Sequence, residues 1–175
     1  MTRSSPRADR AAVCLTFLLA AGMGGCAYTA STLLPAHIKT IAIPVARNTT
    51  DRFGLEQALT NALLAAYARD NHLRVVSGGA DAELVTTIAR YRNEVFSYTA
   101  GNQPSEYQVS IVLSVVFTDH VKNHDLWRND AISATARYPL TDASGMPNTG
   151  GQAHADSVVV QKVADDIVAR TIQGW

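Results

Sequence analysis

The sequence predicts an α+β fold, a two-layer sandwich in which two helices pack on one face of a four- to five-stranded mixed sheet. Two segments repeat their apolar residues every three or four positions, which is the pattern of amphipathic helices. A third segment, over residues 107–118, alternates apolar and polar residues as a half-buried strand does. The helices need an apolar surface to cover, and the alternating strand supplies one.

The first elements in chain order are a strand, a helix and a short strand. Residues 38–46 alternate loosely and predict the first strand, and the turn-forming residues 47–51 supply N-capping groups for a helix. Leucines and alanines recur on one face over residues 55–70, and Asn71 is a typical left-handed helix stop. Residues 73–76 predict a short strand. Strand, helix and strand in this order predict a parallel crossover unit.

A long hairpin comes next. Residues 83–98 and 107–118 have the composition of strands and are joined by a turn-forming sequence at 100–103. In the second of these strands the odd-numbered side chains are apolar and predict a core face, whereas the even-numbered ones are mostly polar. After a further turn at 122–125, residues 126–137 predict one more strand.

The register of strand 83–98 depends on two arginines. A slip of one residue exchanges the two faces of a strand, and one of the two registers would bury Arg90 and Arg92 without partners. Burying them would cost on the order of several kcal/mol each. A bulge near Asn93 would permit part of that second register. We therefore expect the following side chains to point inward: Val85, Thr87, Ala89 and Tyr91.

A loop and a second helix complete the domain. Residues 138–151 are rich in Pro, Gly, Asn, Ser and Thr and predict the loop. The helix that follows has a wide apolar stripe, and Trp175 is expected to pack back on the domain. The stripe consists of Val160, Val163, Ala164, Ile167, Val168, Thr171 and Ile172.

The N-terminal residues have the organisation of a bacterial lipoprotein signal. Arg3, Arg7 and Arg10 form a basic leader, an apolar run follows over residues 11–21, and Met-Gly-Gly then precedes Cys26. The run is shorter than the roughly 20 residues of a membrane-spanning helix. We expect residues 1–25 to be removed, Cys26 to be acylated, 26–36 to form a lipidated tether and 37–175 to form the domain.

Composition limits the class of protein. Removal of residues 1–25 from 175 leaves 150 residues, with 12 Lys and Arg against 14 Asp and Glu and a net charge of −2. Such a chain has no basic field to attract nucleic acid. The only other cysteine, Cys14, leaves with the signal, so a disulfide within one mature chain is excluded. Ala27, where enterobacterial sorting to the inner membrane uses Asp, favours an outer-membrane anchor.

Catalytic chemistry has no support in the sequence. None of the five histidines lies in a metal-binding helical pair, and no G-x-S-x-G segment occurs. His120 and His124 flank a turn and are the one pair to consider for a metal, but a nearby third ligand is missing. The sequence therefore predicts no enzyme, no metal and no cofactor.

Several stretches resemble the LptE family of outer-membrane lipopolysaccharide-assembly lipoproteins. Each stretch is short, but their order and spacing extend over 26–175. They are Cys26-Ala27-Tyr28, residues 34–44, Gly54-Leu55-Glu56 with Leu59-Thr60, Glu106-Tyr107-Gln108, Leu126-Trp127 and Ile172-Gln173-Gly174-Trp175.

The resemblance implies a function. LptE-like proteins sit inside the lumen of the β-barrel LptD, assist its assembly and help to deliver lipopolysaccharide to the outer leaflet. Basic residues near their sheet are implicated in contacts with lipid A phosphates. The turn before Glu106 and the loop 138–151 contain no Lys or Arg here, so the candidates are Arg90, Arg92, Lys122 and Arg128. The alternative is a periplasm-facing lipoprotein that binds another envelope component.

The outward face of the hairpin suggests how such a ligand would bind. We expect apolar side chains to lie there beside Arg90 and Arg92, which would suit an amphiphile that carries phosphates. An ordinary exposed sheet face with strand-forming valines is the simpler alternative. The apolar side chains expected on this face are Leu84, Ile88, Val112 and Val116.

Overall fold

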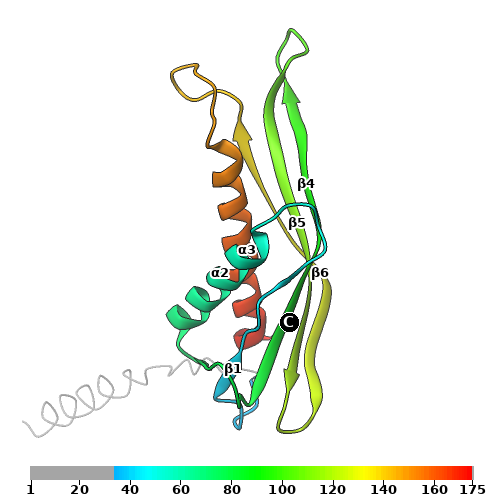
Figure 1. Cartoon of the computed structure of the whole chain (residues 1–175), viewed down its shortest axis with the longest axis vertical. Coiled ribbons are helices and arrows are strands. Elements are labelled where there is room, and N and C mark those ends of the chain that lie inside the picture. The colour runs from blue at the N-terminus through cyan, green and yellow to red at the C-terminus, as the bar shows by residue number, and fades with distance from the viewer. Residues whose placement is uncertain (1–33, 175) are drawn as a thin grey trace, which may run out of the picture. The chain divides into compact units, whose positions relative to one another are not determined.

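The computed structural model describes residues 34–174 and confirms the predicted α+β sandwich (Figure 1). Cys26, the signal 1–25, most of the tether 26–36 and Trp175 lie outside the described residues, so the expectations for them stay predictions. The elements are β1 (Thr40–Ala42), β2 (Arg47–Asn48), α2 (Leu55–Asp70), β3 (Arg74–Val75), β4 (Ala82–Tyr98), β5 (Pro104–Asp119), β6 (His124–Pro139) and α3 (Gly151–Gln173).

The strands form one mixed sheet in the order β3-β1-β4-β5-β6, with β2 paired to β4 off this path. β1 is parallel to both β3 and β4, which confirms the predicted crossover unit. β4, β5 and β6 are antiparallel neighbours and carry most of the sheet. The first strand, predicted over 38–46, is regular only over three residues, because Pro44 lacks the N–H that a continued ladder needs.

Helix α2 has the predicted bounds, but its N-terminus differs from the prediction. Asn71 ends it in the left-handed conformation, with φ 60°, and donates its N–H to the Tyr67 carbonyl. At the other end the cap is Gly54, with φ 86°, a value that favours glycine. The predicted capping segment 47–51 instead forms β2 and the start of a loop, because Asn48 hydrogen-bonds within that loop.

The core lies between the sheet and the two helices, which cover the same side of the sheet (Figure 1). The whole predicted stripe of α3 is buried there. From Val109 onward the odd-numbered side chains of β5 are buried, as the alternation predicted, and the even-numbered ones are half-buried on the opposite face. The buried apolar set of β5 consists of Val109, Ile111, Leu113, Val115 and Phe117.

Strand β4 corrects the predicted register. Val85 and Ala89, expected to face the core, are exposed, whereas Leu84 and Ile88 are 0% exposed. A bulge at Ala89, between the paired residues Ile88 and Arg90, explains the difference. One inserted residue reverses the alternation, so even-numbered side chains face the core before the bulge and odd-numbered ones after it.

The bulge also places the two arginines as predicted. Arg90 and Arg92 point outward, and Tyr91 points toward the helices. Thr87, expected inward, lies on the outward side with Val85. Asn93, where a bulge would have permitted part of the other register, is regularly paired with Val109, and the irregularities of β4 lie at Ala89 and between Val95 and Tyr98.

Candidate functional site

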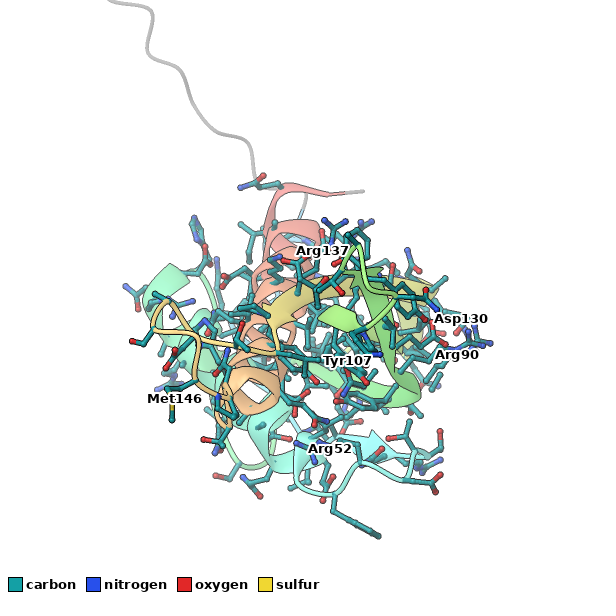
Figure 2. The ribbon with its side chains drawn as sticks, turned by 90° about the horizontal axis from the view of Figure 1, so that it is seen from above. Arg52, Arg90, Tyr107, Asp130, Arg137 and Met146 are labelled. Carbon is teal, nitrogen blue, oxygen red and sulfur yellow. The ribbon has the colours of Figure 1, made fainter. Side chains whose placement is uncertain are left out.

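The face of β4, β5 and β6 that is turned away from the helices is the candidate site, and we call it the outer face. Neither helix covers it, and Figure 2 shows Arg90 and Asp130 on this side with Met146 on the helix side. Its central residues are Val85, Arg90, Arg92, Ser110, Val112, Ser114, Val116, Arg128 and Arg137.

The apolar part of the outer face is smaller than the sequence predicted. Val116 pairs with Val85, whose side chain is 40% exposed, and Val112 is opposite Arg90. The prediction that Leu84 and Ile88 lie on this face is wrong, because the register before the bulge turns both side chains into the core. A short row of valines therefore remains beside the arginines.

Arg90 and Arg92 project from this face on β4, opposite Val112 and Ser110 of β5. Arg92 lies 3.3 Å from the Glu94 carboxylate (Nη1 to Oε1), and both side chains are more than half exposed. Such an exposed pair is weak. Within residues 34–174 no carboxylate lies within ion-pairing distance of Arg90. Both guanidinium groups are thus available to an anionic ligand.

Arg137 is a third cation of this face that the sequence analysis missed. It lies on β6 opposite Gln108, one row beyond Ser110 and Arg92. Standard strand spacings put the Arg92 and Arg137 Cα atoms about 12 Å apart. Its guanidinium carbon lies 3.3 Å from the centre of the Phe96 ring, and its Nε donates to Gln108. The alternation of residues 126–137 already placed Arg137 on one face of a strand. Which face this is, and which cations lie near it, depends on how β6 pairs with β5.

Arg128 is on the same face but is neutralised locally. Its Nε lies 3.1 Å from Asp130 Oδ2, and a hydrogen bond to this carboxylate raises the pKa of the Arg128 guanidinium. Hydrogen bonds, first from Ser114 and then from Arg128, lower the pKa of Asp130. Asp130 therefore stays ionised beside Arg128 and competes with any phosphate.

Lys122 is not brought near the other cations. It lies in the turn between β5 and β6, where its backbone N–H donates to Asp119. The strand rise puts this turn about 30 Å along β5 from Ser110, the partner of Arg92. The structure thus gathers Arg90, Arg92 and Arg137 and separates Lys122 from them.

The histidine pair has ordinary surroundings. His120 Nε2 lies 3.3 Å from the Glu83 carboxylate, and His124 is the exposed first residue of β6. No group of three or more His, Cys, Asp or Glu side chains in the described part of the chain is placed to hold a metal ion.

The comparison with protein families decides the assignment. The family described as LptE, lipopolysaccharide-assembly, matches residues 38–171. The chain belongs to the LptE family. LptE proteins are non-enzymatic lipoproteins of the outer-membrane envelope that act in lipopolysaccharide assembly. Neither helix within residues 34–174 is long and apolar enough to cross a membrane.

Solved structures share the fold of this LptE-family chain at low identity, which shows the fold alone. Uncharacterized lipoprotein B from Nitrosomonas europaea is 15% identical with a TM-score of 0.52, and the match covers 79% of this chain and 86% of that one. Protein XCC0632 from Xanthomonas campestris is 13% identical with a TM-score of 0.54, over 79% and 88%. No curated protein matches the chain.

Proposed function

We propose that this LptE-family protein is anchored in the outer membrane through acylated Cys26, assists the assembly of an LptD-type β-barrel and plugs it. In this position it helps to deliver lipopolysaccharide to the outer leaflet and performs no catalysis. Family membership supports the lipopolysaccharide-assembly role. The barrel partner is the finer part of the proposal.

The outer face supports the contact with lipopolysaccharide. Lipopolysaccharide combines acyl chains with phosphates, and this face combines a row of valines with Arg90, which has no ion pair within residues 34–174, and Arg92, whose pair with Glu94 is weak. Burial of apolar area contributes about 25 cal/mol per Å², and a guanidinium binds phosphate through two parallel hydrogen bonds. The juxtaposition of Val112 with Arg90 is the observation that carries the proposal.

The four cations predicted from sequence have unequal roles in this proposal. Arg90 and Arg92 are the main phosphate contacts, and Arg137 joins them from the far side of β5. Arg128 contributes less because its guanidinium group is already paired with the Asp130 carboxylate. Lys122 meets the ligand only if the ligand extends along the whole of β5.

Charge reversal tests the site. The double variant Arg90→Glu with Arg92→Glu should bind purified lipopolysaccharide at least about tenfold more weakly, since each lost charge-assisted hydrogen bond is worth about 1.5–3 kcal/mol. Its melting temperature should stay near that of the wild type because both side chains are exposed. The control is Arg69→Glu with Arg74→Glu, which changes the net charge equally at exposed positions outside the outer face. Equal binding by both double variants would remove the outer face from the proposal.

The anchor and the partner are tested separately. Intact-mass analysis of the protein from membranes should show acyl chains on Cys26. A large barrel protein should co-purify from detergent-solubilised outer membranes, and depletion of this protein should lower the amount of that barrel. An unmodified Cys26, or an unchanged barrel level, would contradict the corresponding part of the proposal.

A further inference from the structure

Half of strand β4 has a free edge. β2 pairs with β4 only through Arg47 opposite Thr87 and Asn48 opposite Ile88. Beyond these pairs, over 89–98, none of the residues that the structure describes forms a strand on the side away from β5 (Figure 1). A free edge leaves backbone N–H and C=O groups unpaired and is a template for another strand.

A groove begins where β2 ends. One wall is formed by residues 50–52 and the other by residues 89–91, so the groove lies against the bulge and the first part of the free edge. At the end of the groove next to β2, Thr49 donates both its backbone N–H and its hydroxyl to the Ile88 carbonyl. The chain turns away from β4 at this point and leaves the edge beyond it open.

The loop beside the groove is rigidly held by hydrogen bonds. Asn48 accepts from the Thr50 N–H and donates to the Arg52 carbonyl and to Glu56. Arg52 in turn donates to Asp156 of α3, at 2.6 and 3.1 Å. We call residues 48–54 the Phe53 loop.

A second set of contacts fixes this loop to the strand. The carboxylate of Asp156, a residue only 8% exposed, also accepts the Tyr91 hydroxyl at 2.8 Å, and Gln152 donates to that hydroxyl. Tyr91 comes from β4 directly after the bulge. Loop, strand and helix thus meet at one carboxylate, and Figure 2 shows Arg52 at the edge of the domain.

This rigid loop presents an aromatic side chain to its surroundings. Phe53 is 90% exposed, although its neighbour Arg52 is held by Asp156. A large aromatic group on a preorganised loop loses little freedom on binding and is a typical anchor of protein interfaces.

We propose that the Phe53 loop and the free edge of β4 form one protein-docking surface. Its occupant is an extended segment of the barrel partner, which adds to β4 as a strand and encloses Phe53 in an apolar pocket. A lipid acyl chain cannot satisfy the backbone groups of the edge, whereas a peptide strand can. The inference rests on the proposed function for the identity of the partner.

Hydrogen exchange tests the edge. The full-length protein alone and in its purified complex with the barrel are compared by mass spectrometry. Amides within 89–98 that exchange rapidly in the free protein should exchange at least about tenfold more slowly in the complex, because strand addition gives them acceptors. Peptides without protection in this segment would overturn the proposal.

A substitution tests the anchor. Phe53→Ala should weaken binding of the barrel at least about tenfold, which is typical of an interface anchor, with an unchanged melting temperature. The matched control is Met146→Ala, since Met146 is also exposed, at 62%, but lies in another loop. Unchanged affinity of the Phe53 variant would overturn the proposal. Failure of the wild type to form any complex would refute the proposed function as well, so the two failures are distinguishable.

Discussion

Replacement of Asp156 by alanine tests whether one buried carboxylate fixes the Phe53 loop to the domain. The carboxylate accepts hydrogen bonds from Arg52 at 2.6 and 3.1 Å and from the Tyr91 hydroxyl at 2.8 Å. These donors belong to the loop before α2 and to β4, while Asp156 belongs to α3. The variant therefore removes a junction of three elements.

The expected loss follows from the burial of each partner. A hydrogen bond to a charged group contributes about 1.5–3 kcal/mol where it is buried. The Arg52 side chain is 40% exposed, so solvent screening reduces its share, and loss of the acceptor for Tyr91 costs about 1 kcal/mol. Alanine returns about 0.5 kcal/mol through its higher helix propensity. The net loss in the free energy of unfolding is about 2 kcal/mol, or roughly 4–8 °C in melting temperature for a domain of this size.

Thermal and urea unfolding of Asp156→Ala measure this loss, with Asp165→Ala as the matched control. Asp165 is on the same helix and pairs with Arg69 at 2.8 Å, but both side chains are more than half exposed. The control should therefore change stability by less than about 0.5 kcal/mol. Equal stabilities of the two variants would refute the argument that Asp156 holds the loop.

Three further predictions concern the core and the turns. Leu113→Ala should lower the free energy of unfolding, measured in urea, by about 2–5 kcal/mol, whereas Val112→Ala on the outer face should lower it by less than about 1 kcal/mol. Similar losses in the two variants would contradict the assigned faces of β5. Burial opposes ionisation of Asp119, but hydrogen bonds from two backbone amides and a histidine outweigh it and lower its pKa. A lowered carboxyl pKa stabilises the fold above the usual value of 3.8, and that stability is lost as pH falls through the folded pKa. Wild type should thus lose stability below about pH 4, and Asp119→Asn should lose less over that interval; equal losses would contradict the assignment. The Tyr67 hydroxyl donates to Thr171, so Tyr67→Phe should lower the free energy of unfolding by about 1 kcal/mol. Burial raises the pKa of Tyr67, so this tyrosine should not ionise in an alkaline absorbance titration of the folded protein, and the variant should titrate like the wild type. Loss of a titration step in the variant would refute this assignment.

The parts of the fold that depend on local pattern were predictable from the sequence. The bounds of α2, the stop at Asn71 and the buried face of β5 all follow from residue spacing and from the conformational preference of one residue type. The stripe of α3 is a further case. Each of these features is decided by neighbours within a few positions in the chain.

The parts that depend on strand pairing were not predictable in this way. The burial cost of Arg90 and Arg92 correctly indicated that they point outward, but a single unbroken register was then the wrong way to satisfy it. A bulge lets Arg90 and Arg92 point outward while Leu84 and Ile88 before them stay buried. The position of the bulge depends on the pairing of β4 with β5. Arg137 was missed for the same reason, because its row on the sheet depends on how β6 pairs.

The bulge at Ala89 connects the two surfaces that we assign to function. Without an extra residue at this point, the alternation that buries Ile88 would turn Arg90 inward and Tyr91 outward. With it, Arg90 lies on the outer face while the Tyr91 hydroxyl reaches Asp156 on the helix side. One inserted residue therefore both exposes the arginines of the outer face and fixes the loop that presents Phe53. Because the two surfaces depend on the same backbone irregularity, a change in the pairing of β4 would alter both of them together.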